Sequence, residues 1–357
     1  MSLLKTLDDP KTKEIAREVF ERQFRQDPRL EEEYDDRRKS LMYEDIIYNL
    51  SFLDTAVRFD DPDIFRDYSV WIFHLLRNLM KDLHPDRVKD HMLDHYRILG
   101  EVLSEKKPEI EQAGVAQCLE AGIAVIREID VPYPLSHRFQ EEPYAREKQR
   151  YLDLILRSDT RGAIQYSQGL VEAGMPLEDL YVNLIQEAMY EIGELWHQSE
   201  ITVDKEHYAT SVSQMVLSRY YEEIFGRPRI GKTVVSCCVG SELHEMGARM
   251  VSDLFEYHGW DSVYLGAAVP IPALLHAVEE HHPDLLALSV TMTPHLVHCA
   301  DMVDAVRARF PDRWIAVGGR AFTAGPNLWK KMKADTYEAT AVELIRWANE
   351  NIAGEEG

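Results

Sequence analysis

The chain has 357 residues, of which 45% are apolar and 29% charged, a composition that is ordinary for a globular protein. Its 62 acidic residues against 40 Lys and Arg give a net charge of −22, which argues against a nucleic-acid partner. No apolar run approaches a membrane span and the acidic N-terminus is unlike a signal peptide, so we expect a cytoplasmic protein without membrane contact. The four cysteines lack C-x-x-C spacing and are expected in the core.

Residues 1–130 are predicted to form an all-helical domain. Asp-Pro pairs at 9–10 and 61–62 are typical of helix starts. The charged run 31–39 is expected to separate the first two helices. The third predicted helix has a wide apolar face, which suggests that it is buried on more than one side. The predicted helices cover residues 10–25, 41–57, 62–79, 85–103 and 108–129.

Histidines and aromatic residues are dense in this helical domain. Two interpretations stay open: an ordinary helical core with histidines at its surface, or a slot for a planar chromophore whose carboxylates are held by Arg77 or Lys81. No diagnostic motif separates them. The candidate slot residues are Tyr48, Trp71, His74, Arg77, His91 and His95.

Two prolines break the helical pattern and predict a linker at 131–143, followed by a four-helix bundle over 144–228. Its helices are expected at 145–157, 159–174, 177–198 and 203–225. Trp196 lies near the end of the third, and Glu206 and His207 lie near the start of the fourth. By themselves, Trp196 could be core, and Glu206 could favour the positive end of its helix.

Residues 229–357 alternate strands and helices as in a doubly wound, Rossmann-like (flavodoxin-like) domain. Strands are expected at 233–239, 262–266, 285–291 and 315–317, with a last one near 336–337. The segment 241–247, read as the opening of a helix, places His244 beyond the carboxyl end of the first strand, where such sheets bind ligands. Glu242 is close enough to hold the other ring nitrogen of His244.

The pattern Glu242-x-His244-x-x-Gly247 resembles the loop of cobalamin-binding domains, although the usual acid there is Asp. The resemblance implies that His244 is the lower axial ligand of cobalt, supported by Glu242. Ser289-Val290-Thr291, Gly318-Gly319 and the Asp335-Thr336-Tyr337 turn resemble the elements that hold the nucleotide tail of the cofactor. The implied tail pocket consists of Gly247, Ser289, Thr291, Gly318, Gly319, Asp335 and Tyr337. His295 and His298, on the helix that follows, are expected to face solvent.

Trp196, nine intervening residues and Glu206-His207 resemble the W-x9-EH signature of adenosylcobalamin photoreceptors, typified by light-released transcriptional repressors. The resemblance implies that Trp196 shields the upper axial ligand, that Glu206 bonds the adenosyl ribose, and that Val203 and His207 line the same face. It also implies that His197 or His207 binds cobalt after light has broken the cobalt–carbon bond.

The repressors carry an N-terminal DNA-binding module where this chain has acidic helices, so direct nucleic-acid binding is not expected. The layout looks closer to photocobilins, which implies a bilin such as biliverdin in residues 1–130. We therefore predict a cobalamin-dependent light sensor rather than an enzyme, acting in signal transduction as a homo-oligomer. The resemblance implies that its oligomeric state depends on light. The alternative is a corrinoid carrier for methyl transfer, which needs an open upper face. A radical isomerase would need a barrel that is not predicted.

Overall fold

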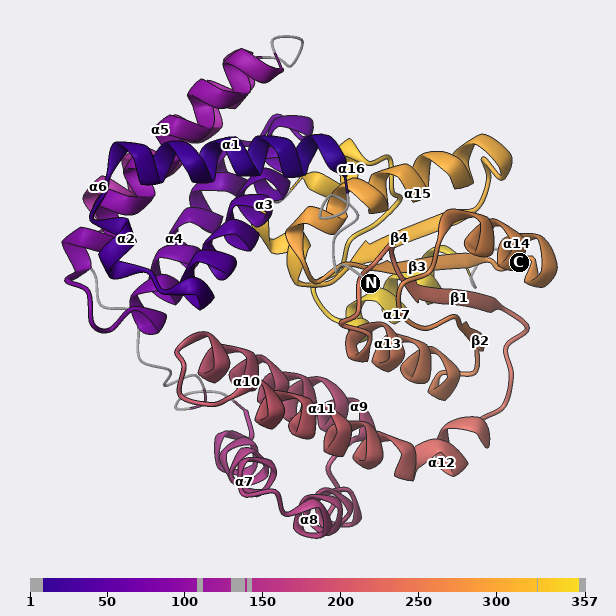
Figure 1. The fold of residues 1–357 in the computed structure, drawn as a ribbon. Helices are drawn as coiled ribbons and strands as arrows, with labels where there is room; N and C mark the ends of the chain where they lie inside the picture. The colour runs from indigo at the N-terminus through magenta and orange to yellow at the C-terminus, as the bar shows by residue number, and fades with distance from the viewer. Residues whose placement is uncertain (1–8, 108–111, 130–138, 140–142, 326, 353–357) are drawn as a thin grey trace.

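A computed structural model describes residues 9–107, 112–129, 139, 143–325 and 327–352. Three parts meet around one centre: N-terminal helices, a helical bundle, and a parallel sheet flanked by helices (Figure 1). The predicted fold class, helical regions followed by an α/β domain, is confirmed. None of the described helices is long and apolar enough to cross a membrane.

The N-terminal part is helical throughout its described residues. Asp9 accepts a hydrogen bond from the backbone N–H of Thr12 and so begins the first helix at the predicted proline. The prediction that the charged run 31–39 separates two helices is wrong in detail: Asp35 caps the backbone N–H of Arg38, and a helix begins within the run. Residues 108–111, the expected start of the fifth helix, lie outside the described residues. The helices are α1 Pro10–Gln26, α2 Leu30–Glu33, α3 Asp36–Arg58, α4 Pro62–Leu79, α5 Pro85–Lys106 and α6 Gln112–Glu128.

The bundle departs from the predicted helices in two places. Its third helix contains a π-helical segment, Leu180–Gln186, between two α-helical pieces. Its fourth ends at Leu217, eight residues before the predicted end, and a 3₁₀ turn leads into a short extra helix. The predicted linker lies outside the described residues except Phe139 and Pro143. The bundle elements are α7 Ala145–Leu156, α8 Thr160–Glu172, α9 Leu177–Asp179, η2 Leu180–Gln186, α10 Glu187–His197, α11 Val203–Leu217, η3 Ser218–Tyr220 and α12 Tyr221–Phe225.

The described part of the α/β domain forms a four-stranded parallel sheet of order β2-β1-β3-β4. Its strands are β1 Thr233–Cys238, β2 Asp261–Tyr264, β3 Leu285–Ser289 and β4 Trp314–Gly318. Cys238 pairs with Ser289, and Ser289 pairs with Gly318, so the ends of three strands are level. The predicted fifth strand is reduced to one bridge, between Ala316 and Thr336. The helical elements are α13 Met246–Tyr257, α14 Ile271–His281, η4 Thr293–His295, α15 Leu296–Arg309, η5 Arg320–Ala324, α16 Leu328–Lys331 and α17 Ala341–Asn351.

Alternate residues of the strands belong to different cores, because successive side chains of a strand point to opposite faces. Val235 and Cys237 belong to the core that includes the N-terminal helices. Val234 belongs to the core shared with the bundle. The N-terminal part also docks on the α/β domain through α3, which packs against η4 and α15. One face of the sheet thus shares a core with the N-terminal helices, and the other face shares a core with the bundle. All four cysteines are buried, as predicted.

A candidate cofactor site between the sheet and the bundle

The loop after β1 carries the candidate axial histidine. The predicted helix at residue 241 is wrong, since α13 begins only at Met246 and residues 241–245 are irregular. Gly240 has a φ of +57°, a left-handed conformation that glycine adopts without strain. This turn leads the chain out of the sheet, so the His244 side chain is 54% exposed at the strand ends.

The Glu242 carboxylate is fully buried and organises this loop. One oxygen accepts from the backbone N–H of His244 at 3.0 Å and from its Nδ1 at 2.5 Å. The other accepts from the backbone N–H groups of Thr291 and Met292, at 2.9 and 2.8 Å. The predicted contact between Glu242 and His244 is therefore present. Because a carboxylate only accepts, Nδ1 of His244 carries a proton, and the lone pair of the neutral ring lies on Nε2.

The electrostatics follow from these contacts. Burial alone would raise the pKa of Glu242, but the hydrogen bonds from His244 and His295 outweigh it and hold that pKa well below the ordinary value. The hydrogen bond to Glu242 raises the pKa of His244, against the opposing effect of burial. Glu242 is thus a fixed anion beneath the exposed imidazole.

His295 is a member of this network that the sequence analysis missed. It was predicted to face solvent, yet it is 2% exposed and its Nδ1 lies 2.9 Å from Glu242. Its Nε2 lies 3.3 Å from the Ser241 hydroxyl. The alignment of β1 and β3 brings the loop after each strand together, which is the signal that could have indicated this contact. Two histidines therefore share one buried carboxylate.

A cavity of about 100 Å³ lies at the strand ends beside this loop. Four predicted tail-pocket residues line it: Gly247, Ser289, Gly318 and Gly319. The Ser236 hydroxyl, which the prediction omitted, also lines it and is buried with no hydrogen-bond partner among the described residues. An unpaired buried hydroxyl is costly, so its place in this cavity favours a polar ligand group.

Three predicted tail-pocket residues do not line this cavity as the structure describes it. The backbone N–H of Thr291 binds Glu242. Asp335 holds the Arg307 guanidinium at 2.6 Å and the backbone N–H of Ile315 at 2.7 Å. The Tyr337 ring stacks on Phe322 at 5.7 Å. The closing turn therefore braces β4 rather than the cavity wall.

The two adjacent glycines allow a test of the cavity. A Cβ at Gly318 would meet no described atom within 4 Å, whereas a Cβ at Gly319, with φ +98°, would lie 2.3 Å from the Val290 carbonyl oxygen. We expect Gly318→Leu to fold normally but to lower cobalamin affinity by about tenfold or more, because it fills the cavity. Gly319→Ala should instead destabilise the protein itself by about 2 to 4 kcal/mol.

Thermal unfolding of the apoprotein and cobalamin titration would measure the two effects separately. Gly169→Ala, at an exposed position of α8 where a Cβ meets no described atom within 4 Å, is the control and should leave affinity unchanged. Normal cobalamin affinity in Gly318→Leu would show that this cavity does not hold the cofactor.

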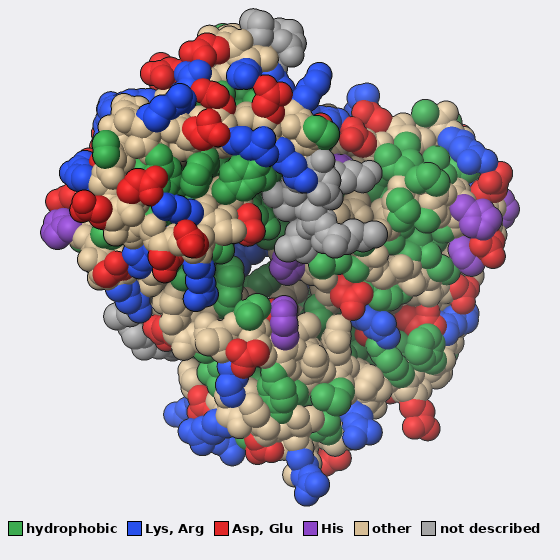
Figure 2. Space-filling model, viewed as in Figure 1, with side chains coloured by type: hydrophobic (Ala, Val, Ile, Leu, Met, Phe, Trp, Pro, Cys, Tyr) green, Lys and Arg blue, Asp and Glu red, His purple; other side chains and the backbone are tan. Residues whose placement is uncertain are grey.

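The bundle and the His244 loop both carry large exposed apolar side chains. Trp196 is 38% exposed and Val203 53% exposed, and Leu243 of the loop itself is 55% exposed. The charge of Glu206 contributes to raising the pKa of His244, so these side chains lie within electrostatic reach of each other. Figure 2 shows a hollow where the three parts meet, with histidine side chains on its rim. Large exposed apolar groups around a hollow indicate a ligand surface.

The two candidate upper histidines lie in different environments. His207 is 74% exposed, and its Nδ1 lies 2.7 Å from Glu206. His197 is 2% exposed and faces the N-terminal part, where its Nε2 lies 2.9 Å from the Trp71 carbonyl oxygen. His207 therefore lies beside Glu206, its neighbour in the sequence, whereas His197 lies in a domain interface.

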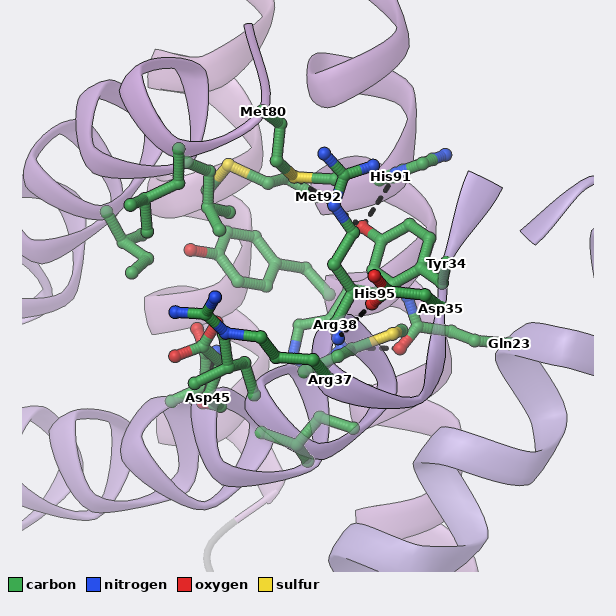
Figure 3. Close-up of a pocket in the computed structure, with 18 residues that line it drawn as sticks. Gln23, Tyr34, Asp35, Arg37, Arg38, Asp45, Met80, His91, Met92 and His95 are labelled. Atoms are coloured by element: carbon green, nitrogen blue, oxygen red, sulfur yellow. Dashed lines mark hydrogen bonds between the residues drawn. The ribbon is translucent and has the colours of Figure 1, made fainter. Parts of the chain in front are cut away.

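A larger cavity, of about 390 Å³, lies within the N-terminal helices (Figure 3). Of the six predicted slot residues only His91 and His95 line it. The prediction that one slot contains all six residues is therefore wrong for this cavity, as far as the structure describes its lining. Trp71 instead packs on His197, and Arg77 lies over the Phe73 ring. Tyr48 and His74 are also absent from the lining. Residues that the prediction missed include Tyr34, Arg37, Asp45 and Asn49.

The walls of this N-terminal cavity offer hydrogen-bond acceptors. The Nδ1 of His95 lies 3.0 Å from Gln23 Oε1, so Nδ1 donates and Nε2 carries the lone pair. Burial lowers the pKa of His95 to about 4, which keeps the ring neutral. The Nε2 of His95 and the Oδ1 of Asn49 are buried without a partner among the described residues. Burial also raises the pKa of Asp45 to about 7.

Two family models of known proteins match parts of this chain. Residues 232–346 match the family model of the B12 binding domain, and residues 147–221 match a second model with the same description. The chain carries B12-binding domains. The exposed imidazole of His244, the cavity at the strand ends and the unpaired hydroxyl of Ser236 fit a corrinoid and its tail.

Proteins of two kinds are among the relatives of this chain. The chain is 30% identical to the HTH-type transcriptional repressor CarH of Myxococcus xanthus over 42% of its length, a match that spans half of that repressor. It is 24% identical to trimethylamine corrinoid protein 1 of Methanosarcina acetivorans, over 58% of this chain and 95% of that protein. The monomethylamine corrinoid protein structure of Methanosarcina barkeri has a TM-score of 0.50 at 19% identity, covering 58% of this chain and 99% of that one, which shows the shared fold.

Proposed function

We propose that this protein is a light sensor whose chromophore is adenosylcobalamin, and that it signals and does not catalyse a reaction. The observation that carries the proposal is the bundle surface around Glu206: Trp196 and Val203 are exposed there, and Glu206 lies within electrostatic reach of the His244 imidazole. A bulky indole and a carboxylate at this place suit a large upper ligand with both an apolar face and hydroxyl groups.

The residues have separate roles in this proposal. His244 would hold cobalt through Nε2 from below, with its orientation fixed by Glu242 and His295. Trp196 would cover the upper ligand, and Glu206 would accept a hydrogen bond from its ribose. Adenosylcobalamin, when bound, supplies a cobalt–carbon bond that light cleaves. Trp196 and Glu206 would then lose their contacts with the adenosyl group. Because these contacts differ between the dark and lit states, light can move the bundle or change the oligomeric state.

Biliverdin is proposed as a second chromophore in the N-terminal cavity. The volume of about 390 Å³ lies in the range of small-molecule sites. Its unpaired acceptors, His95 Nε2 and Asn49 Oδ1, suit the pyrrole N–H groups of a bilin. Arg37 is exposed at the cavity and suits a carboxylate of the ligand.

The second candidate function is a corrinoid carrier for methyl transfer. It is favoured by the match to trimethylamine corrinoid protein 1, which spans 95% of that protein. A carrier must expose the upper face of its cofactor to methyl donors, and an indole over that face would obstruct them. The match also covers only 58% of this chain, so a large part of the chain has no counterpart in that protein.

Absorption spectroscopy tests the choice between these functions. We expect purified protein with adenosylcobalamin to give an alkylcobalamin spectrum in the dark and, after illumination, the spectrum of a histidine-ligated cobalt together with a changed oligomeric state on size-exclusion chromatography. Trp196→Ala should weaken retention of the adenosyl form by about tenfold, whereas His276→Ala, a 75% exposed side chain on α14, should not change it.

Two outcomes would replace the sensor proposal with the carrier. One is an oligomeric state that does not respond to light, and the other is reaction of the reduced cofactor with methyl donors. A red absorption band that stays with the protein through gel filtration after biliverdin is added would support the second chromophore. If the band is lost, the biliverdin proposal falls but the cobalamin proposal stands.

A further inference from the structure

His197 is held in the interface between the bundle and the N-terminal part by three contacts. Its ring stacks on the Trp71 indole, with centroids 4.8 Å apart and planes 18° apart. Its Nε2 lies 2.9 Å from the Trp71 carbonyl oxygen, and its own carbonyl oxygen accepts from Asn78 Nδ2 at 3.3 Å. The side chain is 2% exposed. All three contacts come from α4.

The hydrogen bond to Trp71 fixes the protonation of the imidazole. A carbonyl oxygen can only accept, so Nε2 of His197 must carry the proton. A nitrogen that carries a proton has no lone pair to offer a metal. His197 therefore cannot bind cobalt through Nε2 while the contact with Trp71 lasts, although it directly follows Trp196 in the chain.

Helix α4 also forms a wall of the N-terminal cavity. Ile72, Leu76, Leu79 and Met80, from the helix and its C-cap, line that cavity. Trp71 and Asn78 are seven residues apart, or two helical turns, so they share the face that meets His197. One helix thus contacts the cavity on one side and the residue after Trp196 on the other.

We propose that α4 is a latch on His197: Trp71 and Asn78 keep its imidazole away from the cobalt site, and a ligand in the N-terminal cavity tightens that hold. A molecule that fills the space beside α4 stabilises the docked helix and makes openings that free His197 rarer. This inference rests on the proposed function, because His197 matters to cobalt only if light vacates the upper position.

The first test needs no cofactor. Carbethoxylation of the apoprotein with diethylpyrocarbonate, followed by peptide mass spectrometry, reports the exposure of each histidine. We expect Trp71→Ala to raise the modification rate of His197 by about fivefold or more, whereas Trp71→Phe, which keeps a stacking ring, should stay near wild type. His84, with a 75% exposed side chain, is the internal reference and should not change. Equal protection of His197 in Trp71→Ala would overturn the latch.

The second test follows cobalt ligation after a light pulse in protein loaded with adenosylcobalamin. Trp71→Ala should form the histidine-ligated cobalt several-fold faster than wild type, and adding His197→Ala should remove that gain. Biliverdin bound to the wild type should slow the same step. Photolysis with unchanged ligation rates in Trp71→Ala and with biliverdin would contradict the latch, whereas a wild type that shows no photolysis would contradict the proposed function instead.

Discussion

Replacing His244 with alanine should abolish lower axial ligation and weaken cobalamin binding by on the order of 100-fold, since losing even a residue that supports a metal ligand costs about 10- to 100-fold. The fold should be almost unaffected, because the side chain is 54% exposed. Titration of the apoprotein with cobalamin and electron paramagnetic resonance of the reduced cofactor measure the two effects.

His276→Ala, which removes a 75% exposed side chain of α14, is the matched control. A spectrum of histidine-ligated cobalt that persists in His244→Ala would show that another residue is the lower ligand.

Ligation by His244 should also depend on pH. Glu242 raises the pKa of His244 above its ordinary 6.5, and a proton on Nε2 competes with cobalt. Ligation should therefore strengthen as pH rises, and Glu242→Gln, which removes the charge that raises the pKa of His244, should shift this dependence to lower pH. The folding stability of the apoprotein should change with pH in the opposite direction. The raised pKa means that the protonated pair contributes stability that is fully present below about 6.5 and is lost as pH rises through the folded pKa.

Replacing Glu242 with alanine should have the largest effect on folding. The carboxylate is fully buried and accepts from two backbone N–H groups of the loop after β3 as well as from two histidines. Its removal leaves these donors without a partner, which should lower the unfolding free energy by about 3 to 5 kcal/mol. Denaturant unfolding of the apoprotein measures this loss.

Glu242→Gln is the matched variant, because it keeps the size of the side chain and one acceptor oxygen. It should fold with a smaller loss than alanine and should still bind cobalamin, with His244 less firmly oriented. If alanine and glutamine destabilise equally, the charge of the carboxylate is what matters, and not the number of its hydrogen bonds.

The sequence by itself determined the sheet and the residues at its ends. Buried parallel strands appear as short apolar runs, so β1, β3 and β4 were predicted to within a few residues. His244 and Glu242 are two residues apart, and their contact needs only the local turn at Gly240. Gly318 and Gly319 directly follow the apolar residues of β4, which places them at the strand end whatever the rest of the chain does.

Only the tertiary structure decided which distant residues meet. His295 reaches Glu242 across 53 residues because β1 and β3 are neighbours with level ends. His197 reaches Trp71 across 126 residues because the N-terminal part docks on the bundle, and neither segment shows this in its own pattern. The N-terminal cavity is likewise assembled from residues of several helices, and helical periodicity tells which face is buried but not what it is buried against. Local spacing therefore indicated the lower ligand, and packing between domains decided the position of His197.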